Sequence, residues 1–117
     1  MEFEQVIRKR RMIREFDTDK QIPEKIIRKL LRNAHRAPSA GHTQVQEFVI
    51  VTDPATKRKL RKVAVDQEYV EEAPTLIVVC SNTSRSERRY GSRGREFYSI
   101  IDGAFASMLI LLTAVNE

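Results

Sequence analysis

The stretch with the densest set of hydrogen-bonding side chains at a point where the backbone must turn is Arg36–Gln44. Pro38 cannot continue a helix, and Gly41 permits a positive φ or a close backbone approach. Several side chains beside these two can hydrogen-bond to a ligand: Ser39, His42, Thr43 and Gln44. By spacing alone, a plain connection from a helix to a strand is the simpler interpretation, and a polar ligand site is the alternative.

A second candidate is the basic run Arg8–Arg14, which holds five cations in seven residues. Like charges at this density repel one another, and one phosphate group would relieve several of them through short, charge-assisted hydrogen bonds. Taken alone, the run is also typical of a solvated helix face. The sequence therefore offers two candidate polar sites, and each has an ordinary structural explanation.

Length and charge limit the classes of protein that remain. With 117 residues, we expect a single domain over residues 1–117. The chain has 21 Lys and Arg against 16 Asp and Glu, a net charge of +5. This excess is compatible with nucleic acid, an anionic surface or a phosphate-bearing small molecule as the partner, and charge alone does not choose among them.

Cysteine content and hydropathy address the compartment. Cys80 is the only cysteine, so no intramolecular disulfide can form and no cysteine metal set exists, which fits the reducing cytoplasm. The acidic start Met1–Gln5 does not have the pattern of a signal peptide. No uninterrupted apolar run reaches about 18 residues, so we expect no membrane span. We expect a cytoplasmic protein without a metal site.

The elements around the two candidate sites follow from apolar spacing. Residues 2–10 are expected to form a short helix, and residues 24–37 an amphipathic helix that begins just after Pro23. The β-branched run 47–52 predicts a buried strand. Asp53 and Pro54 then cap and start a helix whose lysines we expect on a solvated basic face.

The second half contains a continuous apolar strand, a polar stretch and a long apolar helix. We expect residues 75–81 to form a central strand buried on both faces, and residues 82–94 to form a mobile surface loop that could act as a lid. Residues 95–115 are apolar around nearly the whole helix circumference. Such a helix must be covered on all sides, so we expect a partner subunit to supply part of the cover.

Taken together, these segments resemble the nitroreductase family of flavoproteins. The resemblance covers almost the whole chain, in order and register, and rests on Arg10–Arg14, Ile22–Glu24, Ala37–Gln44, Phe48–Pro54, Glu72–Pro74, Arg89–Gly94 and Asp102–Ala104. It implies an α+β, nitroreductase-like fold in which helices flank a mixed sheet, assembled as a homodimer. It also implies FMN as the cofactor, NADH or NADPH as the electron donor, and ping-pong reduction of nitroaromatic, quinone or related small-molecule acceptors.

The resemblance also assigns site residues. Arg10 and Arg14 are expected on the phosphate, ribityl or pyrimidine edge of FMN, while Met12 contributes its backbone where the family often has Ser. His42 replaces a frequent Asn, and Val45-Gln46 replaces a frequent Pro-Trp. The expected cofactor-binding residues are Arg10, Arg11, Met12, Arg14, Pro38, Ser39, Ala40, His42, Gln44 and Gln67. The stretch from Pro38 to His42 is expected to approach the flavin from the partner subunit, with Gln44 close behind. Gln67 is expected to reach the pyrimidine. No residue of the chain is expected to be catalytic, because the flavin carries the chemistry.

Two other hypotheses stay open at this point. Family members continue past the apolar helix with further strands, so the chain corresponds to the front portion of the family fold and could be an inactive or truncated flavoprotein. Alternatively, the basic clusters could form a nucleic-acid-binding module. The interleaved acidic residues and the 7% aromatic content weigh against this module, so we expect neither nucleic acid nor a membrane as a partner.

Overall fold

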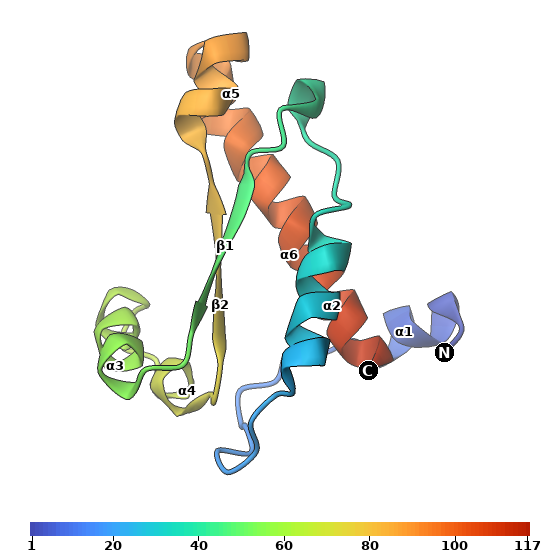
Figure 1. Cartoon of the computed structure of the whole chain (residues 1–117), viewed down its shortest axis with the longest axis vertical. Coiled ribbons are helices and arrows are strands. Elements are labelled where there is room, and N and C mark those ends of the chain that lie inside the picture. Colours follow the sequence, from blue (N-terminus) through green and yellow to red (C-terminus); the bar gives the residue numbers. More distant parts are fainter.

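A computed structural model describes the whole chain, residues 1–117. Helices form most of it, around one pair of strands (Figure 1). In chain order the elements are α1 Phe3–Lys9, α2 Glu24–Ala34, η1 Ala40–His42, β1 Gln46–Val51, α3 Pro54–Val63, α4 Glu68–Glu72, β2 Leu76–Ser81, α5 Thr83–Tyr90, η2 Gly94–Tyr98 and α6 Ser99–Asn116.

The sheet consists of β1 and β2, which pair antiparallel from Gln46 opposite Ser81 to Val51 opposite Leu76. In Figure 1 the two strands form a long ribbon, with α3 and α4 at one end and α5 at the other. The expectation that residues 75–81 form a central strand was wrong for this chain, because β2 has one neighbour and all its residues are half-exposed. The sheet described here is purely antiparallel, and α6 packs beside it.

Helix α2 packs along α6 through an apolar face in which Leu30 and Ala34 are buried. The amphipathic helix predicted over residues 24–37 is present but ends at Ala34, three residues early. Pro38 explains the early end, because it disfavours the helical region for the preceding residue. The His35 ring then meets the Phe48 ring edge to face, 4.9 Å between centroids, and this contact joins α2 to β1.

Helix α3 begins as predicted. Asp53 Oδ2 accepts a hydrogen bond from the Thr56 amide at 2.8 Å, and this bond and the one from the Thr56 hydroxyl hold the pKa of Asp53 below its usual value. The predicted solvated basic face needs one correction. Lys57 is buried, because its Nζ donates to the Ala73 carbonyl at 2.8 Å and so ties α3 to the segment before β2.

The polar stretch 82–94 is the largest departure from expectation. It is no loop, because Thr83–Tyr90 form helix α5, capped where Asn82 Oδ1 accepts from the Arg85 amide at 3.0 Å. Gly91, with φ of 62°, ends the helix and η2 begins three residues later. The two segments pack closely, and a Cβ at Gly94 would overlap the Ser86 carbonyl.

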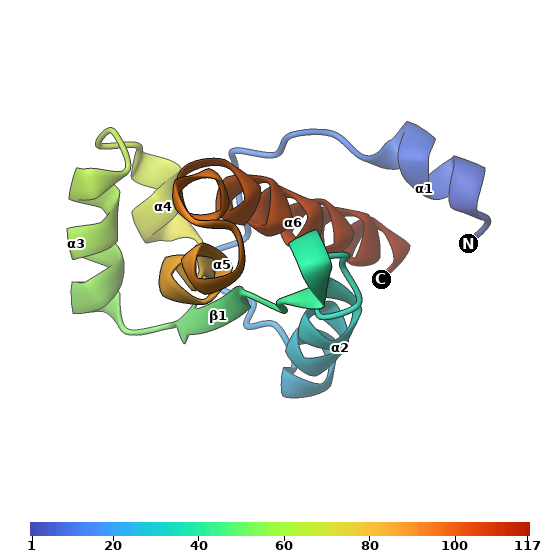
Figure 2. The ribbon, with the colours of Figure 1, turned by 90° about the horizontal axis from the view of Figure 1, so that it is seen from above.

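Together with η2, α6 forms one continuous helix, Gly94–Asn116. By length and composition this helix could cross a membrane, with a mean hydropathy of 1.8. Core helices of soluble proteins have the same composition, and one side of α6 packs on α2 and β2. In Figure 2, α2 lies along one side of α6. The other side of the continuous helix carries large exposed apolar residues: Phe97 in η2, and Ile100, Phe105, Met108 and Leu111 in α6.

The single chain covers little of its own surface. Only 14 of 117 residues are buried, and the accessible surface is 8412 Å². A folded monomer of 13.6 kDa typically exposes about 6,600 Å². The radius of gyration of 15.3 Å likewise exceeds the roughly 13 Å of a compact domain of this length. The open surface includes the apolar face of α6, as the sequence predicted.

Candidate functional site

The stretch Arg36–Gln44, predicted as a polar site and here named the corner, lies between α2 and β1, where the chain folds back on itself. Ser39 Oγ accepts a hydrogen bond from the Gln44 amide at 2.8 Å, and the Thr43 hydroxyl donates to the Ala40 carbonyl at 2.8 Å. Positive φ values occur at Gly41 (59°), His42 (55°) and Gln44 (50°). Non-glycine residues in this region are uncommon and tend to occur at functional sites. The corner thus has a defined, strained backbone.

A buried carboxylate in α6 binds the backbone of the corner. Both oxygens of Asp102, which is 2% exposed, accept from the Ala40 amide at 3.1 and 3.2 Å. The buried Gln46 side chain donates both to the Pro38 carbonyl and to the Asp102 carbonyl, each at 3.1 Å. Burial raises the pKa of the Asp102 carboxyl, and the Ala40 hydrogen bond opposes the rise. These bonds fasten the corner to the middle of the long helix.

We expect Asp102→Asn to raise the free energy of unfolding at neutral pH. A raised pKa means that the folded carboxyl binds its proton more tightly than the unfolded one, so its ionisation above that pKa costs stability. Asparagine keeps an oxygen for the Ala40 amide and does not ionise. The advantage of the variant should therefore shrink as the pH falls through the raised pKa. Urea unfolding of both proteins between about pH 4 and pH 8 measures the difference, and a pH-independent difference contradicts the expectation.

Helix α5 packs against the other side of the corner. Arg85 Nη1 donates to the Gln44 carbonyl at 2.7 Å. A Cβ built on Gly41 would overlap both Tyr90 Oη and Arg89 Nε, so the side chains of α5 lie directly on the corner backbone. The Tyr90 ring in turn meets the Tyr98 ring edge to face, with 5.0 Å between centroids.

A cavity of about 260 Å³ opens beside the corner. Its walls combine corner residues with side chains from about two turns of the long helix. The lining residues are Pro38, Ser39, Ala40, Tyr98, Ile101, Asp102 and Phe105. The mixture of apolar walls with a few polar atoms is typical of small-molecule sites.

The basic run lies elsewhere, along the C-terminal half of α6. There Arg10, Arg11, Met12, Ile13 and Phe16 line a cavity of about 330 Å³ with Leu111, Ala114 and Val115. Arg10, Arg11 and Arg14 form no ion pair within 4.0 Å, although Arg10 Nη1 contacts Met12 Sδ at 3.7 Å. Unpaired guanidinium groups beside an apolar cavity suit a ligand that carries a phosphate and a flat ring.

Gln67 lies on the same side as the basic run. It precedes α4, and the Tyr69 hydroxyl donates to its Oε1. The Tyr69 ring contacts the Phe16 ring edge to face, with 6.4 Å between centroids. Gln67 is thereby linked to the segment that follows Arg14.

The predicted site residues thus form two groups within one chain. The group around Arg10, Arg11 and Met12 faces residues 111–115 of α6, whereas Pro38, Ser39 and Ala40 face residues 101–105. About ten helical residues, or about 15 Å, separate the two groups. His42 and Gln44 are exposed on the corner. Arg14 is exposed and does not line the cavity beside Arg10 and Arg11.

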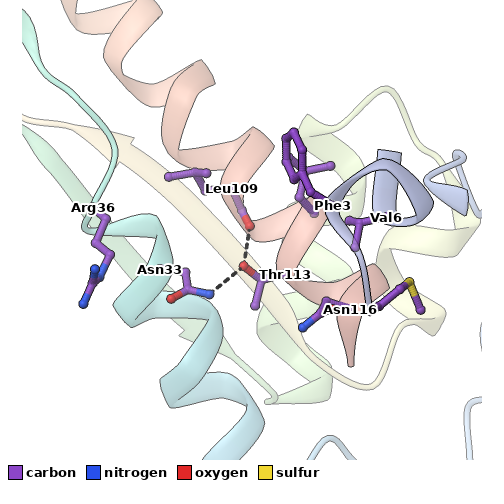
Figure 3. A pocket seen from close by; sticks show the side chains of 9 residues that line it. Phe3, Val6, Asn33, Arg36, Leu109, Thr113 and Asn116 are labelled. Atoms are coloured by element: carbon purple, nitrogen blue, oxygen red, sulfur yellow. Dashed lines mark hydrogen bonds between the residues drawn. The ribbon is translucent and has the colours of Figure 1, made fainter. Parts of the chain in front are cut away.

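A third cavity, of about 330 Å³, lies between α1, α2 and α6 (Figure 3). Phe3 and Val6 approach from α1 and Arg36 from the turn after α2, while Asn33 Nδ2 of α2 donates to Thr113 Oγ1 at 3.0 Å. Thr113 Oγ1 donates onward to the Leu109 carbonyl at 2.7 Å. The polar atoms of Asn33 and Thr113 are therefore already engaged in helix packing.

The sequence expectations missed three contributors to the corner: Asp102, Gln46 and Arg89. Asp102 had a detectable signal, because a carboxylate inside an apolar helix is costly to bury without a partner. Gln46 and Arg89 lie in segments that bear on the family resemblance, but nothing in the sequence indicated their contacts with the corner, because each acts on it through a residue distant in sequence. Gln46 contacts residue 102, and Arg89 contacts residue 41.

The donor set fits FMN at these two groups of residues. The guanidinium groups match a phosphate, and the apolar cavity walls beside Phe16, Phe105 and Tyr98 match a flat aromatic ring.

Comparison with known proteins identifies the family of the chain. The pattern of the nitroreductase family matches residues 7–68, more than half of the chain. A curated NADH dehydrogenase of Thermus thermophilus is 49% identical over 71 residues, covering 61% of this chain and 34% of the relative. Mouse iodotyrosine deiodinase 1 is 35% identical over 141 aligned positions, covering 98% of this chain and 49% of the relative. The chain therefore spans less than half of either curated relative.

A solved structure supports the fold along the whole chain. The nitroreductase family protein of Clostridium novyi superposes with a TM-score of 0.83 at 28% identity, covering 99% of this chain and 65% of that one. The sequence pattern and the superposition agree on the same assignment. The chain belongs to the nitroreductase family and has the α+β fold of that family.

Proposed function

We propose that two copies of this chain form an FMN-dependent oxidoreductase that uses NADH or NADPH to reduce nitroaromatic, quinone or related acceptors. The observation that carries this proposal is the position of the two groups of site residues at opposite ends of the exposed apolar face of α6. The family assignment supports the cofactor and the reaction class. The single cysteine fits a cytoplasmic location.

A second copy is the occupant that best fits the open face of α6. Ile100 and Met108 on this face are 68% and 47% exposed. The chain exposes roughly 1,800 Å² more than a typical monomer of its mass, or roughly 3,600 Å² for two copies, and obligate homodimer interfaces bury about 2,000–5,000 Å² in total. Soluble homo-oligomers most often use a two-fold axis, which packs one patch on the same patch of the other copy.

A two-fold axis perpendicular to α6 would bring the two groups of site residues together. It sets two α6 helices antiparallel, so residues 101–105 of one copy approach residues 111–115 of the other. The corner group of one copy would then meet the basic group of its partner. Each of the two resulting sites would draw on both chains, and neither would exist in a single copy.

In this arrangement the residues take distinct roles. Arg10, Arg11 and Arg14 bind the phosphate and ribityl oxygens, while the backbone of Met12 and the side chain of Gln67 approach the ring. From the other copy, Pro38, Ser39 and Ala40 supply the opposite wall, with His42 and Gln44 at its rim. Asp102 is a positioning residue, because it acts on the corner through the Ala40 amide.

Bound FMN would supply the redox chemistry, accepting hydride from NAD(P)H and passing it to the acceptor in a ping-pong order. The chain supplies orientation and the exclusion of water. Tyr98, Ile101 and Phe105 form an apolar wall, and the strained corner presents backbone groups in one fixed arrangement. No proton-transfer residue of the chain is invoked.

The test is the visible spectrum of the purified chain before and after FMN addition, followed by gel filtration. We expect flavin to elute with a particle of about twice 13.6 kDa. Arg10→Ala and Arg14→Ala should each weaken FMN binding about 10-fold to 100-fold, as the loss of a charge-assisted hydrogen bond predicts. Arg32→Ala, an exposed arginine on α2 that forms no ion pair, is the matched control.

The outcomes separate the alternatives. A colourless dimer would indicate an inactive flavoprotein scaffold, and binding to nucleic acid or lipid vesicles without flavin would contradict the proposal. For a flavin-loaded dimer, NAD(P)H oxidation is followed with nitroaromatic and quinone acceptors. Iodotyrosine joins the panel because of the mouse relative.

A further inference from the structure

We propose that Arg85, Arg88 and Arg89, here named the α5 arginine cluster, bind the phosphates of the nicotinamide dinucleotide and favour NADPH over NADH. This inference rests on the proposed function, since it names the preferred donor for the same site.

The cluster lies on one face of α5. Positions 85, 88 and 89 are three and four residues apart, so their side chains share a helix face. Arg85 is anchored to the corner by its 2.7 Å bond to the Gln44 carbonyl. Arg89 lies against Gly41, at the tip of the corner. The face that carries the cluster is therefore turned toward the candidate site.

Aromatic contacts link the cluster to one wall of the corner cavity. The Arg89 guanidinium lies 5.6 Å from the centroid of the Tyr90 ring, and its Nε donates to the Tyr90 hydroxyl at 3.3 Å. The Tyr90 ring packs on Tyr98, which lines the cavity together with Ser39 and Ala40. With its Nε held, Arg89 keeps the two terminal nitrogens of its guanidinium group for a ligand.

The positive charge of the cluster is largely uncompensated. Arg88 and Arg89 have no carboxylate within 4.0 Å, and the nearest carboxylate oxygen to Arg85 is Glu47 Oε1 at 4.0 Å. The one acid of α5, Glu87, is paired with Arg95 at 2.9 Å. Exposed His42 on the corner adds no negative charge.

This chemistry favours a ligand with more than one phosphate. All the cations of the cluster are arginines, whose planar forks match phosphate oxygens and stack on rings. NADPH differs from NADH by one additional phosphate, worth about −1.5 to −2 charges at neutral pH. An uncompensated cationic cluster packed against the corner therefore binds NADPH more tightly.

The test is calorimetric titration of the full chain, purified with added FMN, using NADP⁺ and NAD⁺ as probes. We expect the affinity for NADP⁺ to be at least about 10-fold higher than the affinity for NAD⁺. Arg88→Ala with Arg89→Ala should weaken NADP⁺ binding about 10-fold to 100-fold and NAD⁺ binding much less. Arg89→Lys keeps the charge without the fork and should retain part of the preference.

The control variant also loses two positive charges, at positions outside the α5 arginine cluster. Arg32→Ala with Lys62→Ala removes two exposed cations that form no ion pair, and it should leave both affinities unchanged. Equal affinity for NADP⁺ and NAD⁺, no binding of either probe, or unchanged NADP⁺ binding in the cluster variant would each overturn the inference. The inference would also be overturned if a labelled single-stranded oligonucleotide bound to the α5 arginine cluster and NADP⁺ did not bind. Flavin retention, read from the spectrum of the same samples, reports separately on the proposed function.

Discussion

A chain carrying Met108→Glu is expected to elute as a monomer and to lose FMN, and Ile100→Glu with Met108→Glu should do so completely. Both residues are exposed in the single chain, so the fold of each copy should survive. In the proposed dimer the glutamates lie between two apolar helices. An unpaired charge buried there costs about 3–5 kcal/mol, which weakens association more than 100-fold.

Light scattering across a concentration series gives the oligomeric state, and the flavin absorbance of the same fractions gives FMN content. Val63→Glu is the matched control, because Val63 is 81% exposed at the end of α3, away from α6. Dimers that persist in the Met108→Glu variant would rule out this face as the interface. Monomers that still hold FMN would show that one chain suffices for the site.

Gly41→Ala is expected to destabilise the corner and release FMN. Gly41 has a φ of 59°, where a side chain costs about 1–2 kcal/mol. In addition, the new Cβ would overlap Tyr90 Oη and Arg89 Nε, so α5 must move away from the corner. Urea unfolding should show a loss of at least about 1–2 kcal/mol, because the overlap adds to the backbone cost, while FMN and NADP⁺ affinities fall together.

Gly91→Ala provides the comparison, because Gly91 also has a positive φ, 62°, but a Cβ there meets no atom within 4 Å. This variant should lose stability through backbone strain and keep its ligand affinities. If Gly41→Ala and Gly91→Ala alter FMN affinity equally, the contact of α5 with the corner has no part in binding.

The sequence predicted those elements whose residues reveal their environment locally. Helix α2 has a continuous apolar face, and α3 has Asp53 and Pro54 at its start, so both were predictable. Helix α5 was missed because Thr83–Tyr90 contains almost no apolar residue and therefore no helical period. Its one local signal was Asn82, which is a favoured helix cap.

The candidate site was predictable in composition and less so in geometry. Arg10 and Ser39 stand out in the sequence, but the separation of their groups along α6 depends on the tertiary fold. Lys57 was misread for a similar reason, because its partner is a backbone carbonyl 16 residues away. Contacts of this kind leave no pattern in the residues beside them.

The two-stranded sheet has a consequence for how the isolated chain behaves in solution. Because β1 and β2 each pair on one side only, the backbone amide and carbonyl groups along each outer edge have no strand partner. Leu76–Ser81 combines β-branched and aliphatic residues without charge or proline, the composition of segments that stack into cross-β fibrils. Unless another strand covers that edge, β2 is the segment through which the protein is most prone to form amyloid.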